Sequence, residues 1–152
     1  MAFIIVLAVS AYWDRTIVLL HVLEAIPYLA AAVFCLRQHP FGYALGVASG
    51  AFWLHVAGTQ TTFVRNGFER VAMLLTTGQV DRWDVFIAAP AALSAGGLVV
   101  FSLWAYLRGP KRLTRDVVVF AAVALLVIGF FSAAFAVAGP RYLPLVRRAF
   151  GL

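Results

Sequence analysis

Four long apolar segments constrain this chain more than any other feature of its sequence. An α-helix needs about 20 apolar residues to cross the roughly 30 Å hydrocarbon core of a bilayer. Segments of that length occupy residues 17–36, 41–64, 85–107 and 117–139. Of the 152 residues, 64% are hydrophobic and 12% are charged, which is more apolar surface than one soluble core of this size can hide. The sequence therefore predicts an all-α integral membrane protein, a four-helix bundle that forms a single multi-pass domain over residues 1–152.

A shorter apolar segment precedes the first span. Residues 2–13 are too few to cross a bilayer as a helix, and Asp14 and Arg15 separate them from the first span. The segment lacks the preceding Lys or Arg that is typical of a secretory signal peptide. We therefore expect a retained, membrane-associated N-terminal extension.

The connection between the second and third spans carries an amphipathic pattern. Its apolar residues fall at positions i, i+3, i+4 and i+7, namely Phe68, Val71, Ala72 and Leu75. The charged Glu69 and Arg70 lie on the other side of such a helix. This pattern predicts a short helix at the membrane interface. The polar residues that end the connection leave an irregular, solvated loop as the alternative.

The basic residues indicate lipid headgroups as partners and not nucleic acid. Twelve Lys and Arg outweigh six Asp and Glu, and the formal net charge is +6. Nearly all the basic residues lie between the apolar segments, where headgroup contact and orientation in the bilayer explain them. Their numbers on the two sides of the bundle differ too little to fix the orientation. Cys35 is the only cysteine, which excludes an intrachain disulfide.

Ionisable residues inside the first two spans form a candidate site. Such side chains are costly against lipid, so they usually face a partner, a cavity or a functional site. His21 and Glu24 are three residues apart, about 300° of helical rotation, and therefore share one face of the first span. The short "RQHP" connection predicts an antiparallel hairpin, which brings His55 to nearly the depth of His21. The candidate intramembrane polar site comprises His21, Glu24, His55, Thr59 and Gln60.

Several interpretations of this site are open. The polar residues could be a hydrogen-bonded pair that sets the position of the first span against the second, which requires only a shared face and depth. Alternatively, His21 and His55 could hold a single haem b, or the cluster could bind a quinone headgroup. A proton or ion path is a further alternative because His and Glu titrate, whereas the ligand set for a metal ion is a weak signal. We expect the hydrogen-bonded pair, with no permanently bound cofactor.

Three glycines mark a second face of the second span. Gly42, Gly46 and Gly50 form a small-xxx-small series, which lets another helix approach closely. They lie about 140° to 220° around the helix axis from His55. The second span should therefore contact protein at this glycine seam as well as at the histidine face.

The sequence favours a function without catalysis. Retinal binding needs a lysine within a span, whereas Lys111 is the only lysine and lies in a connection. No Ser-His-Asp grouping, phosphate-binding loop or HExxH motif is recognisable, so an enzyme that acts on lipid has no positive support. We expect a small membrane subunit or scaffold that packs against other transmembrane subunits or forms a homo-oligomer. The alternative is a redox protein with a haem b or quinone site, or a proton or ion transporter, built on the polar cluster.

Overall fold

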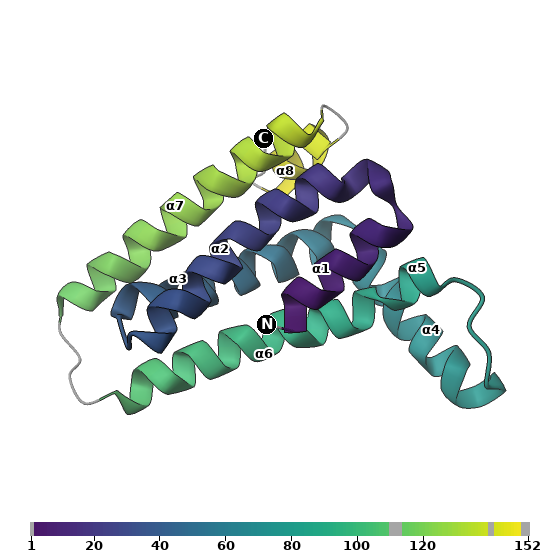
Figure 1. Ribbon diagram of the computed structural model, residues 1–152, viewed down its shortest axis with the longest axis horizontal. Coiled ribbons are helices and arrows are strands. Elements are labelled where there is room, and N and C mark those ends of the chain that lie inside the picture. Colours follow the sequence, from purple (N-terminus) through teal and green to yellow (C-terminus); the bar gives the residue numbers. More distant parts are fainter. Residues whose placement is uncertain (1, 110–113, 140–141, 150–152) are drawn as a thin grey trace.

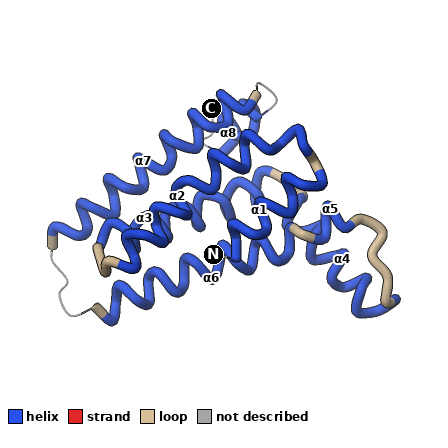
Figure 2. Tube along the Cα trace, in the orientation of Figure 1, coloured by secondary structure: helices blue, strands red, loops and turns tan. Residues whose placement is uncertain are grey.

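The computed structural model describes residues 2–109, 114–139 and 142–149, and these residues form helices and short connections without a strand (Figures 1 and 2). Two of the helical segments are not α-helical: Arg15–Ile17 forms a 3₁₀ turn, η1, and Val56–Gln60 forms a π-helical segment, η2. The α-helices are α1 (Ala2–Trp13), α2 (Val18–Leu36), α3 (Pro40–His55), α4 (Phe63–Thr77), α5 (Trp83–Phe86), α6 (Ala88–Arg108), α7 (Arg115–Ala138) and α8 (Leu143–Ala149). The all-α prediction is confirmed for this part of the chain.

Three helical stretches are long and apolar enough to cross a membrane. They are Arg15–Leu36, Trp83–Arg108 and Arg115–Ala138, and they match the first, third and fourth predicted spans. The predicted span 41–64 differs, because α3 has 16 residues and η2 continues its helical path only to Gln60. The Thr61 hydroxyl donates to the Ala57 carbonyl at 2.7 Å and accepts from the Phe63 amide at 3.2 Å, so it ends one helix and starts the next.

The hairpin between α2 and α3 forms as the "RQHP" connection predicts. Gln38 has a φ of 53°, a left-handed conformation that reverses the chain just after the helix end. The His39 ring nitrogen Nδ1 then accepts a hydrogen bond from the Phe41 amide at 3.2 Å, which caps α3, and Pro40 starts that helix. Consequently α2 and α3 pack as antiparallel neighbours.

Helix α3 is the centre of the bundle and contacts α2, α6 and α7. Its seam glycines are buried against two of these neighbours. A Cβ atom on Gly42 would lie 2.5 Å from the Cys35 backbone nitrogen of α2, and one on Gly50 would lie 2.8 Å from the Ala95 carbonyl oxygen of α6. Gly46 faces Ser102 of α6. The small residues therefore set the rotation of α3 within the bundle.

Helix α1 is a packed part of the bundle. It runs back beside α2, contacts α2 and α6, and buries Phe3 and Leu7 (Figure 1). The Phe3 ring lies 4.5 Å from the ring of Tyr28 and 5.1 Å from that of Trp53, measured between centroids. The short N-terminal segment thus brings its own side chains next to α2 and α3.

Helix α4 forms where the amphipathic pattern predicts a helix, and it projects from one end of the bundle (Figure 1). It contacts α6, and its Gly67 is buried there against Ala88. Phe68 and Leu75 remain exposed. The apolar stripe of α4 is therefore a face that the described part of the chain does not cover.

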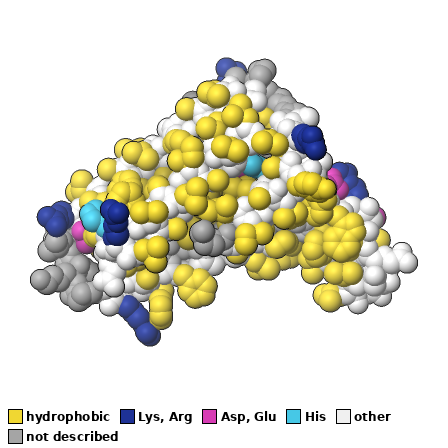
Figure 3. Space-filling model, viewed as in Figure 1, with side chains coloured by type: hydrophobic (Ala, Val, Ile, Leu, Met, Phe, Trp, Pro, Cys, Tyr) yellow, Lys and Arg dark blue, Asp and Glu magenta, His cyan; other side chains and the backbone are white. Residues whose placement is uncertain are grey.

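The outer surface separates apolar from charged side chains. Hydrophobic side chains cover the middle of the face shown in Figure 3, whereas Lys and Arg gather toward the ends of the bundle. The exposed apolar residues include Leu19, Val22, Ile26, Leu29 and Val33 on α2, and Leu125, Leu126 and Val137 on α7. This distribution is compatible with a membrane protein.

Candidate functional site

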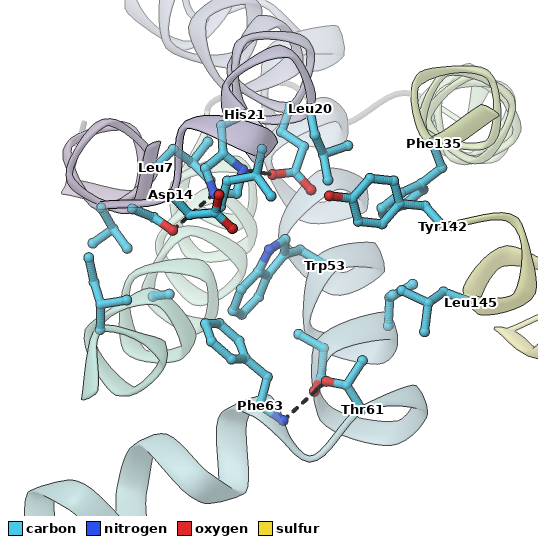
Figure 4. Close-up of a pocket in the computed structure, with 18 of the residues that line it drawn as sticks. Leu7, Asp14, Leu20, His21, Trp53, Thr61, Phe63, Phe135, Tyr142 and Leu145 are labelled. Atoms are coloured by element: carbon cyan, nitrogen blue, oxygen red, sulfur yellow. Dashed lines mark hydrogen bonds and ion pairs between the residues drawn. The ribbon is translucent and has the colours of Figure 1, made fainter. Parts of the chain in front are cut away.

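A cavity of about 500 Å³ lies within one end of the bundle. Its wall combines residues from the facing helices with residues from the α1–α2 turn, from α5 and from the segment around α8. Figure 4 shows Asp14 and His21 on one side of this space, Phe135 and Tyr142 on another, and Trp53 between them. The volume falls within the usual range for sites that bind small molecules.

A chain of three polar residues occupies one wall of the cavity. His21 Nδ1 lies 2.8 Å from Glu24 Oε2, so the helical spacing of the two residues does produce the expected contact. The other ring nitrogen, Nε2, lies 3.1 Å from Ser10 Oγ on α1. All three residues line the cavity. The imidazole ring therefore connects a carboxylate to a hydroxyl group.

The Glu24 carboxylate, at one end of this hydrogen-bonded series of residues, is buried. The Glu24 side chain is 5% exposed, and that of His21 is 16% exposed. A carboxylate in such surroundings requires a close hydrogen-bond partner, which the His21 ring provides. Because Ser10 comes from the neighbouring helix, the contact also fixes α1 beside α2.

Most of the remaining wall is apolar. Phe52 of α3 and Phe131 of α7 stack with their ring centroids 4.9 Å apart, and both line the cavity together with Leu20 and Val56. Trp53 presents the edge of its indole ring that carries the nitrogen toward Asp14 and His21 (Figure 4). The cavity is therefore amphipathic, with a polar wall and a larger aromatic and aliphatic surface.

Two further carboxylates line the cavity at the end of the bundle. Asp14 accepts hydrogen bonds from the amide and the hydroxyl of Thr16, at 2.8 and 2.7 Å, and so caps the turn before α2. Asp84 forms an ion pair and a hydrogen bond with Arg82. The hydrogen bond raises the pKa of the Arg82 guanidinium. Asp14 thus stabilises the turn before α2, and Asp84 holds the Arg82 side chain.

The other residues of the predicted polar site lie elsewhere. His55 and Thr59 are exposed and Gln60 is half-buried, and none of the three belongs to the described cavity wall. The Thr59 hydroxyl donates to the His55 carbonyl at 2.6 Å and accepts from the Gln60 amide group at 2.9 Å. These bonds serve the backbone of the π-helical segment.

This arrangement turns the two histidines, which the sequence places at nearly the same depth in one candidate site, toward different surroundings. His21 points into the cavity with both ring nitrogens bonded, whereas His55 lies on an exposed face of α3. The geometry therefore does not suit a haem held by both rings. Among the described residues, no group of three or more His, Cys, Asp and Glu side chains is arranged to hold a metal ion.

Sequence reasoning missed Ser10 and Tyr142. Ser10 lies in a segment interpreted only as an apolar extension, yet it is four residues before Asp14, and His21 is six residues after Arg15. Similar distances from a tight turn imply similar depths on antiparallel helices, so this signal was present in the sequence. Tyr142 follows the last span, and nothing in its neighbourhood indicates that the chain returns to the cavity.

A second cavity, of about 580 Å³, lies farther along α2 and α6, beside the start of α1. Its described polar side chains are those of Tyr28, Cys35, Tyr43, Ser94 and Ser102. The described wall has no carboxylate and no imidazole. It offers less chemistry than the first cavity and supplies useful control positions.

The chain matches no family model, no curated protein and no solved structure.

Proposed function

We propose that the chain is an integral membrane protein whose four spans form a transmembrane bundle. The three long apolar helices support this, and α3 with η2 supplies the fourth element at the centre of the other three. Helix α3 is shorter than a typical span. Because neighbouring helices cover most of its surface, little of it would contact lipid, and its length need not match the thickness of the bilayer.

We further propose that the bundle binds a lipophilic molecule that carries a carbonyl or hydroxyl group. The observation that carries this proposal is the cavity itself, in which aromatic and aliphatic walls meet the Ser10, His21 and Glu24 chain. Apolar walls favour an aliphatic or ring portion through burial, and the few polar groups orient the other end. A quinone headgroup and an acyl lipid share this chemistry.

Photocrosslinking tests the proposed binding. A long-chain fatty acid that carries a diazirine is incubated with the purified chain in nanodiscs, irradiated, and mapped by mass spectrometry. We expect crosslinks to cavity residues such as Leu7, Phe52 and Phe131. Crosslinks that appear only on the outer, lipid-facing residues would contradict a binding cavity.

A pair of alanine substitutions provides the matched control. Ala57 lines the first cavity and Ala32 lines the second, so Ala57→Phe and Ala32→Phe add the same ring to different cavities. Ala57→Phe should reduce crosslinking in the first cavity at least about tenfold, because it occupies the space that the acyl chain needs. Ala32→Phe should leave that crosslinking unchanged.

A packing subunit or scaffold is the second candidate function. It is favoured by the exposed apolar side chains on α2 and α7, such as Val22 and Leu125, which partner helices could cover. Lipid covers such surfaces equally well, and a subunit requires no internal cavity. Size-exclusion chromatography with light scattering in detergent distinguishes the two: a monomer without a copurifying subunit contradicts the scaffold.

A further inference from the structure

Ser10, His21 and Glu24 are connected atom by atom in the order of a nucleophile, a general base and an orienting carboxylate. The serine hydroxyl meets one ring nitrogen, Nε2, at 3.1 Å, and the carboxylate meets the other, Nδ1, at 2.8 Å. Hydrolases and acyltransferases of unrelated folds use this connectivity, which is recognised by geometry and not by the order of the residues in the sequence. From this geometry we infer that Ser10 is the nucleophile of an acyl-transfer site. This inference rests on the proposed binding of a lipophilic molecule in the same cavity.

A purely structural role explains less of the arrangement. The buried Glu24 carboxylate already has a partner in His21 Nδ1, so Ser10 is not needed for that hydrogen bond. The third member, Ser10, is not buried behind that pair but lines the cavity with it. The hydroxyl that would attack therefore lies where the proposed ligand would bind.

The two hydrogen bonds fit the imidazole tautomer that such a reaction needs. With its proton on Nδ1, the His21 ring donates to the Glu24 carboxylate and leaves the Nε2 lone pair to accept from the Ser10 hydroxyl. Glu24 thereby holds the ring in one tautomer and stabilises the imidazolium that forms when Nε2 takes the serine proton. Glu24 is thus a positioning residue, whereas Ser10 and His21 contact the reacting atoms.

The substrate class follows from the cavity walls. An ester of a long-chain acyl group places its chain against Phe52, Phe131 and the aliphatic residues, and its carbonyl carbon beside Ser10. The indole N–H of Trp53, which points toward Asp14 and His21, is a side-chain donor on the wall that can polarise the carbonyl oxygen (Figure 4).

The reaction balances with water as the second substrate. Ser10 Oγ forms a bond to the carbonyl carbon while its proton moves to His21 Nε2. The bond from that carbon to the alcohol oxygen then breaks, and Nε2 returns the proton to the alcohol. Water next attacks the acyl-serine, gives its proton to Nε2, and releases the carboxylic acid as Nε2 reprotonates Ser10. No electron is gained or lost.

An alkyl fluorophosphonate tests the nucleophile directly in the full chain. In this probe a serine oxygen replaces fluoride on phosphorus, so an activated serine gains a stable mass. We expect the wild-type chain in nanodiscs to gain one adduct, and peptide mapping to place it on Ser10. Absence of the adduct from wild-type Ser10 would overturn the inference, without any variant having to fold.

Variants test the activation of the serine. Ser10→Ala should remove the adduct, and His21→Gln should slow labelling at least about 100-fold, because the base is lost. Ser94 is the control, because it lies in the second cavity, where the described wall has no imidazole. In the Ser94→Ala variant, the probe should label Ser10 at the wild-type rate. Equal labelling rates in wild type and a folded His21→Gln variant would contradict the inference.

The photocrosslinking experiment separates this inference from the proposed function. Crosslinks within the first cavity, combined with no fluorophosphonate adduct on Ser10, would leave lipophile binding in place and remove the acyl-transfer chemistry. Absence of both results would remove both.

Discussion

The Oγ atom of Ser10 lies 3.1 Å from Nε2 of His21, although α1 carries the serine and α2 carries the histidine. The turn at Asp14 brings the two helices together in antiparallel order, with its side chain accepting from the Thr16 amide and hydroxyl. A polar contact between two apolar helices specifies their relative depth, because sliding one helix would break the hydrogen bond between the serine hydroxyl and Nε2. This contact therefore contributes to the fold whatever chemistry it supports.

The first prediction compares two histidines. His21→Ala should lower the free energy of unfolding in detergent by about 1 kcal/mol, because Glu24 and Ser10 both lose a partner inside the bundle. His55→Ala should change it by less than about 0.5 kcal/mol, because the His55 side chain is exposed. Denaturant titration followed by circular dichroism measures both values, and a larger loss for His55→Ala would contradict the described orientation of α3.

Two glycines provide the second prediction. Gly50→Ala should destabilise the chain by about 1–3 kcal/mol, because the new Cβ would lie 2.8 Å from the backbone oxygen of Ala95, which cannot move by itself. A Cβ added at Gly96 of α6 meets nothing within 4 Å among the described atoms. Gly96→Ala should therefore be neutral or stabilising, since alanine is the better helix former. Similar losses for the two variants would show that the glycine seam does not limit packing.

Local geometry made part of the site predictable. The His21–Glu24 contact follows from a spacing of three residues on one helix, and the α2–α3 hairpin follows from a connection too short for any other arrangement. Helix α4 was predictable from its apolar period. Each of these inferences uses residues within a few positions of one another.

The position of His55 shows where such reasoning fails. Counting residues from a turn gives the depth of a side chain along a helix but not the rotation of that helix about its axis. The glycines decide the rotation of α3: Gly42 faces α2, and Gly46 and Gly50 face α6. His55 lies on the other side and is therefore turned outward, whereas Trp53, two residues earlier, lines the cavity.

The third prediction concerns the projecting helix α4. Leu75 is 80% exposed, and an interfacial helix would place this apolar side chain against lipid. A fluorophore attached to Leu75→Cys, in a Cys35→Ala background, should emit at shorter wavelength in nanodiscs and be quenched by brominated lipid. Thr77, about 200° around the helix, is the control and should show neither effect. Equal quenching at the two positions would mean that α4 does not lie in the interface.

The last prediction concerns the end of the bundle opposite the first cavity, the one that Ser10, His21 and Glu24 line. Asp116 of α7 is buried, and the hydroxyl of Tyr106 on α6 donates to its Oδ2 atom at 3.2 Å. Asp116→Leu should therefore destabilise the chain by about 1–3 kcal/mol, because it leaves polar groups in an apolar setting, whereas Asp116→Asn keeps an acceptor oxygen and should cost less. Tyr106→Phe should also destabilise it, and Tyr43→Phe, which alters the neighbouring ring 6.4 Å away, is the matched control. Denaturant titration of the four variants gives the comparison. If Asp116→Leu is as stable as Asp116→Asn, the carboxylate does not hold α6 and α7 together, and contacts such as that between the Tyr106 and Phe120 rings do so instead.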